Sequence, residues 1–187
     1  FIRSFRWVEK VHVLGYQWGS QPVLLYATQK PQKINRLVLL GSRWKYVDSG
    51  VAAAPGPMRT LGQQASLLKP DDGDLDQEFV RRRAQVCRSE STQAPNGALR
   101  DLTKPSPIEP AKIKSPLLLI QGERDGSPEQ ISDRLNLLRE LGSREKWFVS
   151  LKGLGKFALI ERGHQRFDQA LLSFLEQTPP ASAPASP

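Results

Sequence analysis

The stretch Val11–Gly19, VHVLGYQWG, decides how this chain folds. Val11–Leu14 is a short run rich in apolar and β-branched residues, and Gly15 closes it, which is typical of a buried strand that ends in a sharp turn. Ser20–Gln29 follows with apolar residues at mixed helical spacing, and Pro22 falls in the first turn, where its missing N–H does no harm. The stretch therefore predicts a strand that passes through a tight turn into a helix.

A second strand is predicted at Ile34–Leu40, after Pro31 ends the helix. Its run Leu37–Leu40 is continuously apolar and stops at Gly41, a pattern typical of strands in parallel sheets. A strand, a helix and a strand in this order form a right-handed crossover, which places both strands in one parallel sheet with the helix on its face.

The same alternation returns in the second half of the chain and favours a doubly wound parallel sheet of the α/β class. We expect, in order, a strand at Ser115–Ile120, a helix from about Pro128 to Leu141, a strand at Lys146–Ser150 and a helix from about Arg166 to Gln177.

Two regions lack this alternation. Prolines interrupt any long element between about residues 44 and 110, where only Asp74–Ser89 forms an amphipathic pattern, so we expect a cap-like insertion that packs over the sheet edge. Residues 178–187 are Pro, Ala and Ser, and we expect a disordered tail. The chain is therefore interpreted as one domain over residues 1–177 followed by this tail.

Composition excludes several classes of protein. No run in the 187 residues approaches the roughly 20 apolar residues that a membrane-spanning helix requires, and the first residues lack the apolar segment of a signal peptide. The single cysteine, Cys87, excludes an internal disulfide and is interpreted as an inert thiol. We expect a soluble intracellular protein of the cytoplasm or an organelle matrix.

The net charge of +8 favours acidic neighbours, of which nucleic acid is one. The only tight basic cluster is formed by Arg81, Arg82 and Arg83 beside Arg88, without interleaved aromatic residues. A solvated helix face explains such a cluster better than a nucleic-acid site, which stays open as the least favoured function.

Val11–Gly19 resembles the nucleophile elbow of the α/β-hydrolases, in which a strand meets a helix through a Gly-x-Ser-x-Gly turn. Gly15 and Gly19 occupy the two glycine positions, where we expect no room for side chains. Gln17 occupies the position of the nucleophilic serine. We expect Gln17 to lie in a tight turn with a strained backbone.

Two later segments resemble the same family in the same order. Lys114–Asp125, KSPLLLIQGERD, resembles the strand before the acid loop, and the resemblance implies that Asp125 is the acid that orients the catalytic histidine. Leu151–Glu161, LKGLGKFALIE, resembles the loop that carries this histidine, and Lys156 stands in its position. The resemblance covers about residues 5–177 except the variable middle, and the family's N-terminal part has no counterpart in this chain.

The catalytic positions implied by the resemblance form a degenerate triad: Gln17, Asp125 and Lys156. A glutamine amide has no proton that a base can take near neutral pH, and a lysine is a poor base unless burial depresses its pKa. Asp125 is interpreted either as the relic acid or as a loop residue that caps the helix after Pro128. We expect none of these residues to be catalytically active, and we expect no cofactor and no metal site.

Other polar residues near these positions provide alternatives. His164 can be paired with Asp125 in a rebuilt dyad, although a surface or capping role is more ordinary for it. Ser20 is expected to face away from the elbow, and Ser42 ends the second strand with no histidine assigned nearby. Three further residues are interpreted as structural. Tyr16 and Trp18 are expected to pack around the turn, and His12 is expected to be satisfied in a core or an interface.

These features favour a non-catalytic α/β-hydrolase-like protein that acts as a structural or accessory subunit of a larger assembly, for example in an organelle. The alternative is a hydrolase or related enzyme that acts on a small ester-like or carbonyl substrate by unorthodox chemistry, with Gln17 and Lys156 as hydrogen-bond donors to an oxyanion. The strand at Val11–Leu14 lies mid-sheet in the family, so its edge lacks a partner here. We therefore expect another protein chain to pack near residues 1–14.

Overall fold

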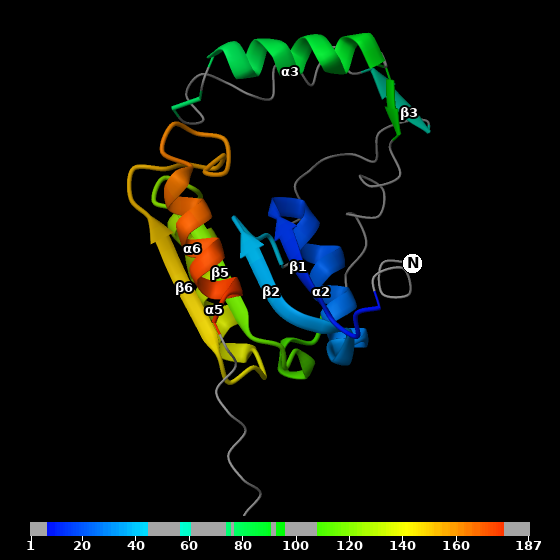
Figure 1. Cartoon of the computed structure of the whole chain (residues 1–187), viewed down its shortest axis with the longest axis vertical. Coiled ribbons are helices and arrows are strands. Elements are labelled where there is room, and N and C mark those ends of the chain that lie inside the picture. Colours follow the sequence, from blue (N-terminus) through cyan, green and yellow to red (C-terminus); the bar gives the residue numbers. More distant parts are fainter. Residues whose placement is uncertain are drawn as a thin grey trace, which may run out of the picture.

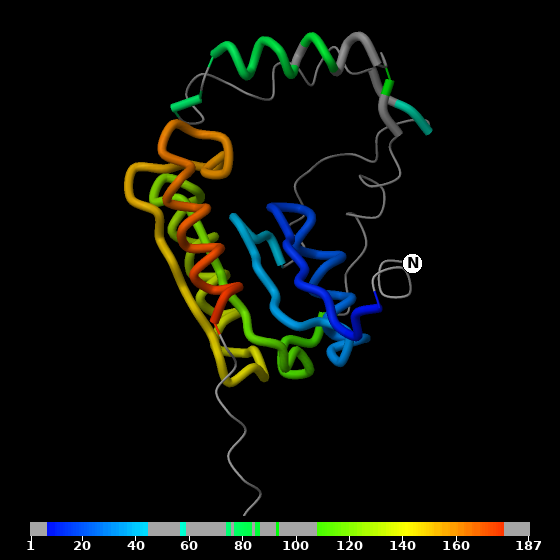
Figure 2. Tube along the Cα trace, viewed as in Figure 1, coloured from blue at the N-terminus to red at the C-terminus, as the bar shows by residue number. Residues whose placement is uncertain are grey.

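The computed structural model describes residues 7–44, 57–60, 74–75, 77–90, 93–95 and 108–177. Its centre is a parallel sheet of four strands in the order β1-β2-β5-β6. The strands are β1 (Val11–Tyr16), β2 (Ile34–Leu40), β5 (Leu117–Gly122) and β6 (Lys146–Leu151). Their order across the sheet follows the order along the chain, as the colours in Figure 2 show.

Helices cover both faces of the sheet, so the predicted parallel α/β architecture is confirmed (Figure 1). On one face, α2 (Ser20–Gln29) and α5 (Pro128–Glu140) pack against the sheet through buried residues such as Leu24 and Leu137. On the other face, α6 (Gln165–Leu175) contributes Phe167 and Phe174, which are seven residues apart and so lie on one side of the helix.

The helix ends follow local sequence signals. α2 ends at Gln29, just before Pro31 begins a short 3-10 turn. α5 begins with Pro128 in its first turn and Ser127 as its N-cap, and the Ser127 side chain accepts from Gln130 N while Gln130 reaches back to the N-cap backbone. This capping box satisfies two backbone groups that the first turn leaves without helical partners.

A buried arginine ties the end of α6 to β2. Arg36 is 2% exposed, and its guanidinium donates to Glu145 Oε1 at 2.8 Å and to the Gln177 carbonyl at 2.7 Å. The same guanidinium lies 4.8 Å from the centre of the Phe174 ring. Because its charge is paired and its donors are used, Arg36 is accommodated inside the fold.

Part of the expected insertion lies beyond the carboxyl ends of the strands, where α3 (Gln77–Glu90) crosses the top of Figure 1. The predicted helix at Asp74–Ser89 is confirmed with shifted ends. Two three-residue strands, β3 (Met58–Thr60) and β4 (Gln93–Pro95), pair antiparallel and were not predicted. The residues outside the described part are 1–6, the insertion residues 45–56, 61–73, 76, 91–92 and 96–107, and the expected tail at 178–187.

Candidate functional site

The turn between β1 and α2 has the strained backbone that the sequence predicts. Gln17 follows β1 directly, begins a 3-10 turn that leads into α2, and has φ +47°. This left-handed conformation is unfavourable for a residue with a side chain and is typical of positions that present a residue at a functional site.

The two glycines of the turn are not equivalent. A Cβ atom at Gly15 would lie 2.9 Å from the Cα of Ser20, so the strand and the helix approach too closely there for any side chain. A Cβ atom at Gly19 would meet no described atom within 4 Å. The expectation that neither position has room is therefore wrong for Gly19, because the close approach of the backbone is between Gly15 and the start of α2.

The side chain of Gln17 is held against the loop that carries Lys156. Its Nε2 atom donates to the Tyr16 hydroxyl at 3.2 Å and to the Lys156 carbonyl at 3.4 Å. The Tyr16 hydroxyl donates to the same carbonyl at 3.1 Å. Tyr16 also packs against the buried cluster beneath α6, in agreement with the structural role expected of it.

Asp125 reaches the same place from the end of β5. A Cβ atom at Gly41, which follows β2 with φ +57°, would lie 2.7 Å from Asp125 Oδ2 and 3.6 Å from Gln17 Cγ. The elbow and the acid loop therefore border the same small volume at the carboxyl edge of the sheet. The sequence indicated Gly41 only as the end of a strand, because its closeness to Asp125 depends on how β2 and β5 lie together.

Asp125 is paired with a buried arginine that the sequence did not single out. Arg134 Nη2 lies 3.2 Å from Asp125 Oδ2, and the two side chains are 2% and 10% exposed, respectively. Arg134 also donates to the carbonyls of Asp125 at 2.8 Å and Ser42 at 3.1 Å, and to Gln121 Oε1 at 3.2 Å. The expected capping role of Asp125 is wrong, because Ser127 caps α5.

The surroundings of Arg134 set its electrostatics. Burial lowers the pKa of Arg134 from its ordinary value, the charge and hydrogen bond of Asp125 raise it, and the nearby charge of Arg43 lowers it. A guanidinium remains protonated in proteins, so the pair is a carboxylate and a cation that neutralise each other. Asp125 therefore has a charged partner in Arg134.

Lys156 lies in a loop that a second buried carboxylate holds in shape. Glu161 is fully buried, and its two oxygens accept from Gly155 N at 3.0 Å, while Oε1 also accepts from Phe157 N at 3.1 Å. Lys156 is half-buried, and its ammonium lies 5.3 Å from the centre of the Phe157 ring. Backbone N–H groups thus fix the loop, and the lysine side chain extends along an aromatic ring.

The alternative histidine dyad does not form. His164 Nδ1 lies 3.2 Å from the Glu161 carbonyl oxygen, and its Nε2 lies 3.8 Å from Asp168 Oδ2 on the next turn of α6. The carboxylate beside this imidazole is thus Asp168, and the cation beside Asp125 is Arg134. His164 occupies the N-cap position of α6 without a side-chain cap bond.

Neither alternative serine is placed as a nucleophile beside a base. Ser20 is buried and its hydroxyl donates to the Gly15 carbonyl at 3.4 Å, which agrees with its expected orientation away from the elbow. Ser42 is 3% exposed, and in the described part of the chain its hydroxyl has no hydrogen-bond partner.

Two other expectations concern residues near the turn. His12 is exposed and its Nε2 lies 3.3 Å from Asn35 Nδ2, so the interpretation as a core residue is wrong. Trp18 is half-buried, and the guanidinium of Arg43 lies 5.3 Å from its ring centre.

The described side chains of the basic cluster lie on an exposed face of α3. Arg81 and Arg82 are 71% and 74% exposed and both pair with Glu78 at 2.7 Å. Among the described residues, no group of three His, Cys, Asp or Glu side chains is arranged to hold a metal ion. No helix in the described part is long and apolar enough to span a bilayer.

Comparison with solved structures shows that the chain has the α/β-hydrolase fold. A monoacylglycerol lipase from Paleococcus ferrophilus is 22% identical with a TM-score of 0.64, and the match covers 93% of this chain and 70% of the lipase. A serine hydrolase involved in carbazole degradation is 21% identical with a TM-score of 0.58, and the match covers 89% of this chain and 63% of the hydrolase. An enol-lactonase from Burkholderia xenovorans is 18% identical with a TM-score of 0.63, and the match covers 94% of this chain and 69% of the lactonase. The chain thus spans about two thirds of the length of these structures.

No family model matches the sequence, and no curated protein matches it. At these low identities the likeness is one of fold, and chemistry has to be argued from the residues of the site.

Proposed function

We propose that this chain is a non-catalytic α/β-hydrolase-like protein that acts as an accessory or structural subunit of a larger assembly. The observation that carries the proposal is Gln17, whose backbone keeps the strained elbow conformation while its side chain is bonded to Tyr16 and Lys156. Serine hydrolysis needs a hydroxyl whose proton a histidine can remove. An amide at this position forms no acyl-enzyme.

The other two positions support the same proposal. An ammonium at Lys156 has no lone pair with which to accept a proton, and the side chain extends along Phe157. Asp125 is neutralised by Arg134 at 3.2 Å. A histidine restored at position 156 would therefore compete with a buried arginine for its acid.

An edge of the sheet supports the accessory role. β1 pairs with β2 on one side, and the described residues provide no strand for its other side. His12 is exposed and Leu14 is 43% exposed on this strand. We propose that another protein chain packs against β1 near residues 1–14.

An assay with short-chain activated esters tests the lack of catalysis. We expect no turnover by the unmodified chain and little or none by Gln17→Ser with Lys156→His, because Arg134 engages Asp125. Gln32→Ser, at an exposed position outside the site, provides a matched control.

Turnover by the unmodified chain that Gln17→Ala abolishes would contradict the proposal and favour the enzyme of unorthodox chemistry. The Gln17 amide nitrogen donates to the Tyr16 hydroxyl and to the Lys156 carbonyl, which argues against its use as a free oxyanion donor.

Hydrogen exchange tests the proposed partner surface. In the isolated chain at micromolar concentration, we expect faster amide exchange in β1 than in β5, which has a strand on each side. Purification of the native protein should yield a complex in which Val11–Leu14 becomes protected. A monomer in which β1 is already as protected as β5 would rule out a partner at this edge.

A further inference from the structure

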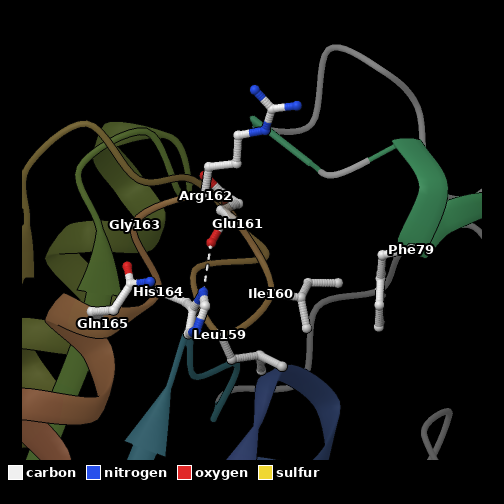
Figure 3. A pocket seen from close by; sticks show the side chains of 8 residues that line it. All are labelled: Phe79, Leu159, Ile160, Glu161, Arg162, Gly163, His164 and Gln165. Carbon is white, nitrogen blue, oxygen red and sulfur yellow. Dashed lines mark hydrogen bonds between the residues drawn. The ribbon is translucent and has the colours of Figure 1, made fainter.

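Arginines near the carboxyl ends of β2, β5 and β6 have partners within the protein. Figure 3 shows one of them, Arg162, whose guanidinium is turned away from the other side chains that line the pocket beside α6. Its Nε lies 4.0 Å from Asp74 Oδ1. The others are engaged by a carboxylate, a carbonyl oxygen or an aromatic ring: Arg134 with Asp125, Arg124 with Gly153, Arg166 with Lys152 and Arg43 with Trp18.

The amino ends of the same strands have cations of another kind. Lys33 directly precedes β2, and Lys114 and Arg144 lie three and two residues before β5 and β6, respectively. Lys30 lies just before the short 3-10 turn that leads into β2. Lys33 is half-buried and the other three side chains are exposed. Within the described part of the chain these four residues, which we call the basic edge, form no ion pair.

The first two strands of the basic edge are joined where their lysines stand. Ser115, the residue after Lys114, donates through its hydroxyl to the carbonyl of Ile34 at 3.2 Å. Ile34 is the residue after Lys33. The two lysines therefore precede positions that are in direct contact.

The third strand continues the same row. An added Cβ atom at Gly142 would lie 2.5 Å from Lys114 Nζ, so the ammonium lies beside the loop that leads to Arg144 and β6. Figure 1 shows the amino ends of the strands together at the lower end of the sheet. Neighbouring strands are about 5 Å apart, so the cations before β2, β5 and β6 are spread over roughly 10 Å.

The carboxylates at this end do not neutralise the row. Glu109 pairs with Lys112 at 2.8 Å, and Glu145 pairs with the buried Arg36 at 2.8 Å. The remaining exposed carboxylates lie at the rim: Glu9 beside Lys10 before β1, Glu140 at the end of α5 and Glu176 after α6. The basic edge therefore keeps an excess of positive charge at its centre.

Lysine predominates in the basic edge, and this residue type favours a particular partner. An ammonium is a compact, strongly hydrated point charge without the planar fork of arginine. Lysine is depleted at the centres of protein–protein interfaces. Duplex nucleic acid is read by a helix or a β-ribbon that enters a groove, whereas the basic edge presents strand starts and short 3-10 turns. Hydrated anions on a broad surface, such as those of acidic phospholipids, fit these cations better.

We propose that the basic edge binds the surface of a membrane that contains anionic phospholipids, with the amino ends of β2, β5 and β6 toward the headgroups. Binding of this kind is peripheral and electrostatic. The surface includes neither Gln17 nor a residue of β1, so it is separate from the proposed accessory role and can be tested separately.

Sedimentation of the full chain with vesicles tests this assignment. We expect the chain to bind vesicles of phosphatidylcholine mixed with phosphatidylserine and not vesicles of phosphatidylcholine alone. Added salt should release it, because the screening length falls from about 10 Å at 0.1 M to about 3 Å at 1 M ionic strength. Equal binding to both vesicles, or no binding to the anionic ones at low salt, would overturn the proposal. So would tighter binding to duplex DNA of mixed sequence than to the anionic vesicles.

Paired substitutions locate the surface. Lys33→Gln with Lys114→Gln removes two charges from the centre of the row and should weaken binding to the anionic vesicles about 30-fold, since each basic residue near an anionic surface contributes about fivefold. Lys30→Gln with Arg144→Gln removes two exposed charges and should have a similar effect. Urea unfolding of each variant shows whether the fold is retained.

α3 provides a matched control for the change in net charge. Arg81→Gln with Arg82→Gln removes two charges from exposed positions that pair with Glu78, away from the basic edge. This variant should bind the anionic vesicles as the unmodified chain does. An equal loss of binding in the control would show a general effect of net charge and contradict the proposal.

Discussion

The edge and the centre of the sheet can be compared along one row of side chains. Leu14 of β1, Val38 of β2 and Leu118 of β5 are register partners and point to the face that α6 covers. Val38 is 1% exposed and Leu118 0%, whereas Leu14 is 43% exposed. Because the same kind of residue is covered in the centre and uncovered at the edge, the apolar pattern of β1 fits a larger structure than the described residues provide.

Polar groups show the same contrast. At the centre, the charges of Arg36 and Arg134 are buried and each has a carboxylate within 3.2 Å. At the edge, His12 is exposed beside Asn35, and partial desolvation, followed by the charge of Arg36, lowers the pKa of His12. Charged side chains at the centre of the sheet are therefore buried with a partner of opposite charge, whereas polar side chains at the edge can still be hydrated.

The largest loss of stability is expected when the buried ion pair at the centre of the sheet is broken. Arg134→Met leaves the buried Asp125 carboxylate without its cation, and the loss of one partner of a buried ion pair costs about 3–5 kcal/mol. Replacing both residues, as Asp125→Leu with Arg134→Met, removes the unpaired charge and should recover most of this loss. Urea unfolding of the single and double variants measures both effects.

A result in which Arg134→Met costs under about 1 kcal/mol would mean that water reaches Asp125. The Asp125 site would then be hydrated, as the edge of the sheet is, and Asp125 could bind another partner.

The row itself provides the next comparison. Leu118→Ala should lower the free energy of unfolding by about 2–5 kcal/mol, because it leaves a cavity under α6. Leu14→Ala on the same row should cost under about 1 kcal/mol in the isolated chain, because its side chain already contacts water. If the two variants cost the same, the edge is covered in solution. If Leu14→Ala weakens a native complex, the edge is the binding surface.

Much of this fold follows from local pattern. Continuous apolar runs at Leu37–Leu40 and Leu117–Ile120 predict buried parallel strands, and the strand-turn-helix at Val11–Gln29 predicts the strained position of Gln17. β3 and β4 are three residues long and too short to give a periodic signal.

The partners of the site were harder to predict. Arg134 follows Asp125 by nine residues, and its pairing depends on how α5 is rotated against the end of β5. The carboxylate beside His164 is that of Asp168, one turn away on α6, and not that of Asp125. Residue types at the elbow and acid positions can be found by motif, whereas the contacts that give them a role require the packed structure.

The smallest effect concerns the two glycines of the elbow, where sequence motif and structure differ. Gly15→Ala places a Cβ atom 2.9 Å from the Ser20 Cα and 3.1 Å from the Gly19 carbonyl oxygen, and backbone atoms cannot turn aside as a side chain can. Such overpacking costs about 1–3 kcal/mol. At Gly19, φ is −62° and ψ is −13°, and no described atom stands within 4 Å of the added Cβ.

Gly19→Ala should therefore be neutral or raise the free energy of unfolding by about 0.4–1 kcal/mol, because alanine restricts the unfolded chain and fits the native backbone. Urea unfolding of both variants at equal denaturant slope measures the difference. If Gly19→Ala were as destabilising as Gly15→Ala, something outside the described residues would fill the space beside Gly19.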